Sequence, residues 1–196
     1  MGFTGDSEAK FSRANELADK AMALDDTNAW VLGTKGMALA PLGQFEEGVA
    51  IMARAVELHP GNADVRAFYG IVLVHAGRYE EAVEHIRAAM ALNPRYPNFY
   101  LNIMTRSLLS MGRYDDALPY SERQLALEPD NLLTNLQYTM IMLRRGRETD
   151  ARAAIERVRQ IAPNLRTRHI RQLYLQNDND FMTEFAEALN AAGLPE

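Results

Sequence analysis

The chain has 196 residues, of which 47% are hydrophobic and 24% are charged, proportions that are ordinary for a folded globular protein. It contains no cysteine, which excludes disulfides, thiolate zinc sites and cysteine nucleophiles. It has no apolar run near the roughly 20 residues that a membrane span requires. The opening residues, MGFTGDSEAK, lack both the charged and the apolar part of a signal peptide. We therefore expect a cytoplasmic protein of a bacterial type.

Helices are expected along the whole chain, in pairs, with no strand. The first, at 7–24, looks like the second member of a pair. Either the array starts on this half repeat or, as we expect, the chain is cut from a longer one. Four pairs follow, at 28–41 and 45–58, 63–76 and 79–92, 98–111 and 114–127, and 132–145 and 148–161. After Pro163 two more helices are expected at 166–176 and 180–192, with Asp178 or Asn179 as the cap of the last and Gly193 at its end.

The helix pairs repeat one another, most plainly in GRYEEAVEHIRAAMALNP, from Gly77, and GRYDDALPYSERQLALEPD, from Gly112. Glycine supplies the left-handed conformation that ends the first helix, and proline stops the second helix. A small residue between them permits close helix contact. These positions recur at intervals of 34, 35 and 34 residues: Gly43, Gly77, Gly112 and Gly146; Pro60, Pro94, Pro129 and Pro163; and Gly48, Ala82, Ala117 and Ala151. An aromatic residue stands between glycine and small residue in three repeats: Phe45, Tyr79 and Tyr114.

This pattern resembles the tetratricopeptide repeat (TPR) over about residues 28–163. Gly36 and Gly70 match the family's small residue in the first helix, and Ala55 and Ala89 its late small residue in the second. The later repeats depart from the pattern, with Thr105, Thr139, Gln124 and Val158 at these positions. The resemblance implies an all-α superhelical solenoid of antiparallel helix pairs with a C-terminal capping helix pair. We expect an array over 1–163 (half repeat 7–27, full repeats about 29–62, 63–97, 98–131 and 132–165) and capping helices over 166–196.

Two phrases outside the repeat signature, LNPRYPNFYL (Leu92–Leu101) and FAEALNAAGLPE (Phe185–Glu196), resemble the C-terminal TPR regions of bacterial class III adenylate/guanylate cyclases. Related TPR tails occur on bacterial winged-helix regulators. The resemblance implies a regulatory or assembly segment of a multidomain signalling protein. The repeats take up the chain, so no cyclase catalytic domain fits within it.

Catalytic and metal-binding motifs are lacking in the sequence. The four histidines form no H-E-x-x-H motif, and Glu81 with His85, one turn apart, is more simply a solvated helix face. NDND at 177–180 lacks the glycine and glutamate of a calcium loop, and we interpret it as a helix cap. There is no glycine-rich phosphate loop and no G-x-S-x-G. We therefore expect a protein that is not an enzyme and that has no cofactor.

The inner faces of the first helices are the expected binding surface, because first helices line the concave side of such arrays. The register places a largely apolar set there, for an apolar or amphipathic peptide helix. Arg106 would orient a carboxylate or a helix C-terminus. Alternatively, the C-terminal helices or neighbouring turns cover part of this set. The candidate residues are Trp30, Met37, Ile71, Phe99, Asn102, Arg106 and Met140.

The net charge of −5 is unevenly placed. Residues 144–171 hold nine arginines and three acidic residues, a local balance of +6, so the rest of the chain carries −11. This Arg144–Arg171 cluster is a solvated face, a docking patch for an acidic protein surface, or a nucleic-acid site. The last is disfavoured because Tyr174 is its only interleaved aromatic. We therefore expect a protein or peptide partner, with two alternatives: a self-associating module that dimerises its parent, and a nucleic-acid adaptor.

Overall fold

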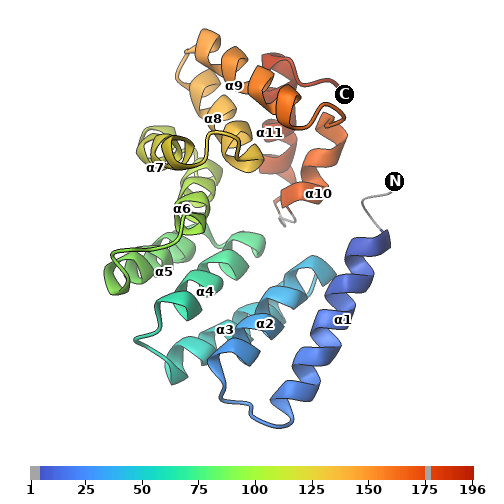
Figure 1. The fold of residues 1–196 in the computed structure, drawn as a ribbon, viewed down its shortest axis with the longest axis vertical. Coiled ribbons are helices and arrows are strands. Elements are labelled where there is room, and N and C mark those ends of the chain that lie inside the picture. Colours follow the sequence, from blue (N-terminus) through green and yellow to red (C-terminus); the bar gives the residue numbers. More distant parts are fainter. Residues whose placement is uncertain (1–4, 175–177) are drawn as a thin grey trace. The chain divides into compact units, whose positions relative to one another are not determined.

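The computed structural model describes residues 5–174 and 178–196, with side chains from residue 9 onward. Within these ranges it contains eleven α-helices, two 3-10 helices and no strand, which confirms the all-α prediction (Figure 1). The described residues divide into two compact units, one of residues 5–96 and one of residues 97–174 and 178–196. We refer to them as unit 1 and unit 2 and describe each by itself. The predicted division into a repeat array over 1–163 and capping helices over 166–196 stays a prediction.

Unit 1 consists of a single helix followed by two helix pairs. Helix α1 packs on α2, the pairs are α2–α3 and α4–α5, and the first helices α2 and α4 also lie side by side (Figure 1). Its elements are α1 (Gly5–Met22), α2 (Ala29–Leu39) with the 3-10 turn η1 (Ala40–Leu42), α3 (Phe45–Leu58), α4 (Ala63–His75) and α5 (Tyr79–Leu92).

Unit 2 has two helix pairs and a C-terminal segment. The pairs are α6–α7 and α8–α9, and helix α11 packs on both α8 and α9. Its elements are α6 (Phe99–Ser110), α7 (Tyr114–Leu127), α8 (Leu132–Arg144), α9 (Glu148–Ile161), η2 (Thr167–His169), α10 (Ile170–Tyr174) and α11 (Asn179–Ala192).

The helix ends follow from the turn glycines and the Asp178 cap that the sequence predicts, together with three asparagine caps that it did not single out. The glycines of all four turns have positive φ, between 69° and 80°, and Gly193 ends α11 with φ 117°. Asn28, Asn62 and Asn131 cap α2, α4 and α8 through their side-chain oxygens, and Asp178 caps α11 in the same way. Predicted and observed bounds of the four pairs therefore differ by at most two residues.

The expected helix at 166–176 is the exception. Residues 167–169 form a 3-10 turn and 170–174 a separate short helix, while 175–176 lie outside the described residues. Arg166 has an extended backbone, and its main-chain N–H donates to Nδ1 of His169. The main-chain N–H of Thr167 donates to the carbonyl of Pro195 (2.9 Å). These bonds hold the start of the segment in a non-helical conformation that apolar periodicity alone did not predict.

Close helix contact within each pair depends on the small residues of the repeat. A Cβ added to Gly70 in α4 would lie 2.8 Å from Cγ1 of Ile86 in α5, and one added to Gly36 would lie 2.6 Å from Cγ of Met52. Ala82 and Ala117 are fully buried. In the third repeat Thr105 replaces the glycine, and the register places Ser121 in the position of Ile86. Side-chain volume has thus moved from the second helix to the first.

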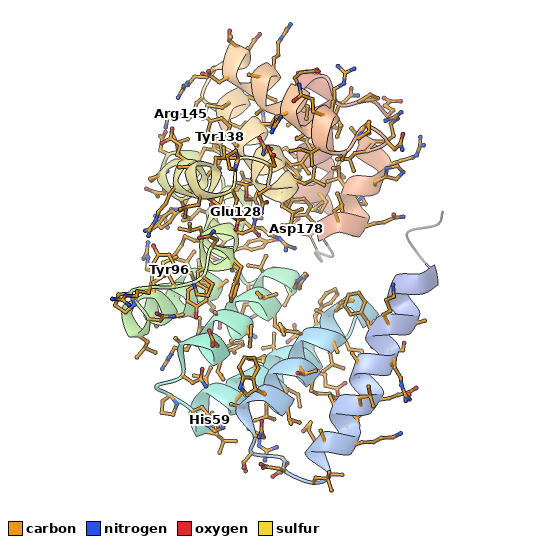
Figure 2. The ribbon with its side chains drawn as sticks, viewed as in Figure 1. His59, Tyr96, Glu128, Tyr138, Arg145 and Asp178 are labelled. Atoms are coloured by element: carbon orange, nitrogen blue, oxygen red, sulfur yellow. The ribbon has the colours of Figure 1, made fainter. Side chains whose placement is uncertain are left out.

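Polar contacts tie successive repeats together at their turns. In unit 1, Nε2 of His59 at the end of α3 lies 2.6 Å from the carbonyl oxygen of Thr27, just before α2 (Figure 2). In unit 2, the Glu128 carboxylate accepts from the side-chain amides of Asn98 (2.8 Å) and Asn131 (2.9 Å). Both bonds lower the pKa of Glu128, and the bond from Asn98 has the larger effect. The starts of α6 and α8 are therefore fixed to the end of α7.

Candidate functional site

An aromatic surface lies on the inner helices of unit 1. Trp30, near the start of α2, is 65% exposed, and its ring lies beside that of Phe68 in α4, with centroids 6.0 Å apart. Gly33 makes room for Phe68, since a Cβ at Gly33 would lie 3.2 Å from the Phe68 ring. Met37 and Ile71, which continue the same two helices, are partly exposed. Three predicted residues of unit 1 are thus accessible to a partner.

Phe68 is the residue of this surface that sequence analysis missed. The repeat register places its neighbour Ala67, and Val74 two turns later, on the inner face of α4, and both are buried. The register was therefore about one position from the exposed face of α4. An aromatic side chain beside an inner position, with a glycine opposite on the preceding first helix, is the signal that could have found it.

In unit 2, the predicted residues of α6 take part in internal contacts. Asn102 donates through Nδ2 to Oε1 of Gln137 in α8 (3.4 Å), and Arg106 donates to the main-chain oxygen of Tyr174. Phe99 is partly exposed and packs edge to face against Tyr100, with centroids 4.8 Å apart. The inner face of α6 thus contacts α8 and the C-terminal segment.

Tyr174 fills the inner face of unit 2. Its ring lies under the Arg106 guanidinium, with Cζ 5.1 Å from the ring centroid, and its hydroxyl donates to the carbonyl of Leu133 in α8 (3.3 Å). The side chain is 1% exposed. Burial raises the pKa of Tyr174 well above its usual range, so the hydroxyl remains a donor at physiological pH. The alternative that the C-terminal segment covers part of the inner set holds here.

Met140 is not accessible in this structure. It is completely buried in α8, as is Leu136 one turn earlier. Helix α11 packs on α8 and α9, and its residues Phe181, Phe185 and Leu189 are buried. Met140 therefore belongs to the interior of unit 2, and its candidate role as a surface contact is corrected. The repeat register gives the direction of a side chain within its helix, but not whether other parts of the chain cover it.

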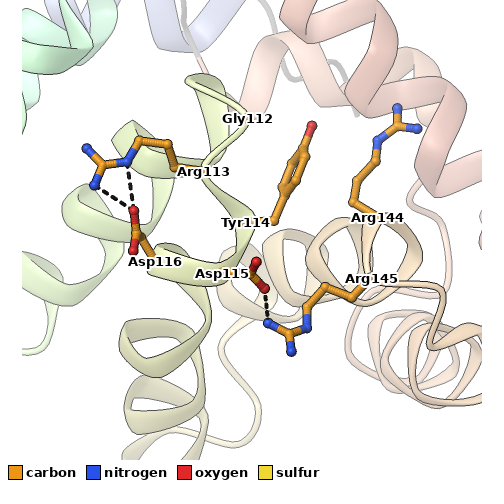
Figure 3. Close-up of a pocket in the computed structure, with 7 residues that line it drawn as sticks. All are labelled: Gly112, Arg113, Tyr114, Asp115, Asp116, Arg144 and Arg145. Carbon is orange, nitrogen blue, oxygen red and sulfur yellow. Dashed lines mark hydrogen bonds and ion pairs between the residues drawn. The ribbon is translucent and has the colours of Figure 1, made fainter.

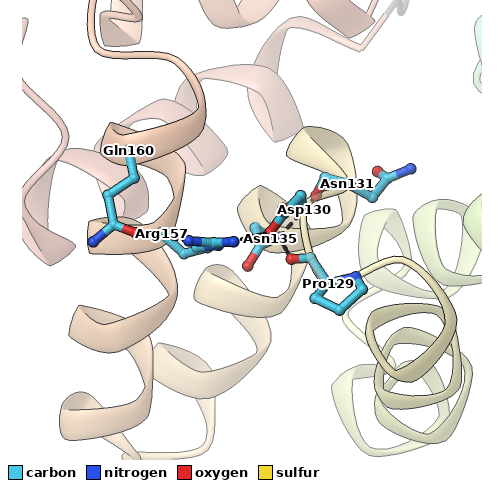
Figure 4. A network of polar contacts seen from close by, with 6 residues as sticks. All are labelled: Pro129, Asp130, Asn131, Asn135, Arg157 and Gln160. Atoms are coloured by element: carbon cyan, nitrogen blue, oxygen red, sulfur yellow. Dashed lines mark hydrogen bonds and ion pairs between the residues drawn. The ribbon is translucent and has the colours of Figure 1, made fainter.

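The arginines of residues 144–171 are mostly paired with acidic side chains. Six of the nine form ion pairs: Arg144 with Glu184, Arg145 with Asp115, Arg147 with Asp150, Arg152 with Glu148, Arg157 with Asp130 and Arg159 with Glu156. Figure 4 shows Arg157 between Asp130 and Gln160, beside Asn135, whose amide donates to the carbonyl of Pro129. Three of the partner acids lie outside the window. The excess charge seen in the sequence is thus partly offset by folding.

Two hollows occur in unit 2. The first, of about 540 Å³, is lined by the α6–α7 turn and the end of α8. Its Arg113–Asp116 and Arg145–Asp115 pairs are shown in Figure 3, beside Tyr114. The phenol of Tyr114 lies 3.4 Å from the Glu184 carboxylate, which also accepts from Arg144 (2.5 Å). Burial raises the pKa of Tyr114. Both lining carboxylates are thus engaged by guanidinium groups.

The second hollow, of about 670 Å³, is lined by residues of η2, α10 and α11 and by Glu196. It has lining side chains of both signs: Arg168, Arg171, Glu187 and Glu196. Arg171 is already bonded to Asn179 Oδ1 (2.6 Å) and Thr183 Oγ1 (2.8 Å). Within residues 5–174 and 178–196, no group of three or more His, Asp or Glu could hold a metal ion. Nor is any helix of those residues long and apolar enough to cross a membrane.

Comparisons with known proteins agree on the fold. A model of the tetratricopeptide repeat family matches residues 42–101 and 108–176. Among solved structures, PilW, described as a widely conserved type IV pilus biogenesis factor, is similar with a TM-score of 0.72 at 17% identity, over 92% of this chain and 85% of PilW. YrrB, described as a TPR protein with an unusual peptide-binding site, gives 0.62 at 18% identity, over 91% and 93%.

MamA gives a TM-score of 0.64 at 17% identity, over 81% of this chain and 92% of MamA. At these identities the likeness concerns the arrangement of the helices alone. The comparison with curated protein sequences gave no match.

Proposed function

The chain belongs to the tetratricopeptide repeat family, and from that premise we propose that it is a non-catalytic module that binds a peptide or protein segment on the inner faces of its first helices. The observation that carries the proposal is Trp30, 65% exposed beside Phe68 on the inner helices of unit 1. Large exposed aromatic residues are costly to leave in water and are the residues that most often dominate binding energy.

The proposed contact residues are Trp30, Met37 and Ile71 in unit 1 and Phe99, Asn102 and Arg106 in unit 2. In unit 1 they offer apolar area, which suits the apolar stripe of an amphipathic helix. The peptide binding ascribed to YrrB, a protein of similar fold, supports this choice of partner class. Met140 is omitted because it is buried.

The proposal extends to the setting of the module. We place it in the cytoplasm, as the regulatory or assembly segment of a multidomain, adenylate cyclase-like bacterial signalling protein. This rests on the sequence phrases Leu92–Leu101 and Phe185–Glu196 alone. Self-association that dimerises the parent is the competing function, and light scattering at several protein concentrations measures it directly.

Selection from a random 12-residue peptide display library against the full chain tests the proposal. Labelled peptides recovered from it should bind with a Kd at least about 30-fold weaker for Trp30→Ala, since truncating a dominant tryptophan costs about 2 kcal/mol or more. Glu80→Ala and Glu84→Ala are the matched controls, because both glutamates are exposed on the second helix α5. Loss of binding in these controls, with Trp30→Ala unchanged, would refute the proposed surface.

A further inference from the structure

Helix α10 occupies the inner face of unit 2 as a ligand would. We propose that Ile170–Tyr174 is an internal ligand, a latch, that closes this face until a partner helix ending in an aromatic residue replaces it. The inference deepens the proposed function and rests on it for the use of the inner face as a binding surface. It also names the chemistry of the partner, which the repeat register does not.

The latch is held by three kinds of contact that converge on its last residue. Arg106 donates to the main-chain oxygen of Tyr174, where the negative end of the α10 dipole lies. The same guanidinium lies 5.1 Å from the centre of the Tyr174 ring, in cation–π range. The Tyr174 hydroxyl then donates to the carbonyl of Leu133. Tyr174 thus contacts the Arg106 guanidinium through both its main-chain oxygen and its ring, and the Leu133 carbonyl through its hydroxyl.

The structure of α10 allows it to leave without unfolding unit 2. It has five residues, and helices this short are unstable in water without packing. Its bonds to α6 and α8 come from Tyr174. Helix α11 also contacts α10, because Arg171 donates to Asn179 and Thr183 and the Tyr174 ring packs edge to face on Phe185, with centroids 5.0 Å apart. It has anchors of its own as well: Asp178 caps it, and it packs on α8 and α9. Detachment of α10 would break the first set of contacts and leave the second.

The residues expected in the partner follow from the two latch residues, Ile170 and Tyr174, that it would replace. Ile170, fully buried, and Tyr174 are four residues apart, hence on one helical face. A competing segment needs an aliphatic residue and, one turn later at the helix end, an aromatic residue with a hydroxyl. If the closed form outnumbers the open one by about 100 to 1, the apparent Kd for such a segment is weakened about 100-fold. The latch would then set a threshold for binding at this site.

Hydrogen exchange of the full chain tests the latch without any variant. The amides of α10 should exchange through a local opening, faster than those of α9 and α11. The second measurement uses a labelled, amidated peptide with the latch sequence, RTRHIRQLY (Arg166–Tyr174). It should bind the Tyr174→Ala chain at least about tenfold more tightly than the natural chain. Arg106→Met added to Tyr174→Ala should abolish that gain.

Three results would overturn the latch. These are exchange of α10 together with α11 by global unfolding, loss of the folded state in Tyr174→Ala by circular dichroism, and equal peptide affinity with and without Arg106. Library peptides that bind the full chain through Trp30 keep the two proposals apart. Their affinity depends on Trp30 and should not change in Tyr174→Ala. Failure of the library selection with faster α10 exchange would reject the unit 1 surface and leave the latch.

Discussion

Replacing Gly70 by alanine is expected to destabilise unit 1, although alanine is the better helix former. Gly70 lies inside α4, and the added Cβ would stand 2.8 Å from Cγ1 and 2.9 Å from Cδ1 of Ile86. Both distances are shorter than carbon atoms tolerate. Ile86 is fully buried and branched at Cβ, so it has few alternative rotamers. The helices must therefore move apart, or Ile86 must adopt a strained conformation.

The magnitude follows from two opposing effects. Overpacking a well-packed core costs about 1–3 kcal/mol, and contacts this short fall in the upper part of that range. Replacing glycine by alanine inside a helix stabilises the helix by about 1 kcal/mol. The net loss is about 1–2 kcal/mol. In Ile86→Ala, where the obstructing atoms are gone, Gly70→Ala should instead stabilise by up to about 1 kcal/mol.

Urea denaturation of the four proteins of this double-mutant cycle measures the effect. Trp30, the only tryptophan, reports on unit 1 by fluorescence, and circular dichroism follows the whole chain. Gly61→Ala is the control, because a Cβ there meets nothing within 4 Å and φ is not positive. A gain of stability in Gly70→Ala, or a coupling energy near zero in the cycle, would show that the α4–α5 contact is looser than described.

Three further predictions concern other parts of the chain. Ala82→Arg and Ala117→Arg should each cost at least about 3 kcal/mol, because both sites are fully buried, and unchanged melting would contradict the register. Burial, with Arg66 adding to it and Glu81 and Glu84 opposing it, lowers the pKa of His85. The unfolded chain therefore binds the proton first, and stability should fall as pH drops below about 6.5 until the folded pKa is passed; His85→Gln should flatten that part of the pH profile. Removal of the residues after Pro163 should lower Tm by at least about 10 °C or cause aggregation, because α11 packs on α8 and α9; an unchanged melting curve would mean that α11 covers nothing essential.

The helices were predictable because their ends depend on local chemistry. Gly43, Gly77, Gly112 and Gly146 adopt the left-handed conformation that the sequence pattern requires, and the asparagine caps bond within three residues. None of this needs tertiary information. The same holds for the buried small residues Ala82 and Ala117, whose spacing fixes the face by which second helices pack.

The accessibility of the inner residues was not predictable from the repeat. Trp30 and Met140 occupy inner positions of their helices, yet one is 65% exposed and the other fully buried. Helix α8, which carries Met140, is packed against α11, a helix that no repeat position describes. The arginines show the same limit: their partners Asp115, Asp130 and Glu184 are 27 to 40 residues away in sequence. Pairing at such distances depends on the fold.

The inner residue Arg106 connects these two levels of description. Its position on α6 follows from the repeat register, and a guanidinium there suits a carboxylate or the carbonyl end of a helix equally well. In unit 2 it meets the carbonyl end of the chain's own α10. Because the cation–π contact with Tyr174 adds an aromatic requirement, a partner bearing only an acidic terminus would lack half of what the site offers. If the latch is displaced as proposed, Arg106 would contact the partner's helix end and aromatic ring in place of those of Tyr174. We therefore expect a segment that offers both to bind better than a free acidic tail, and this preference comes from how Arg106 is used in unit 2 and not from the repeat that carries it.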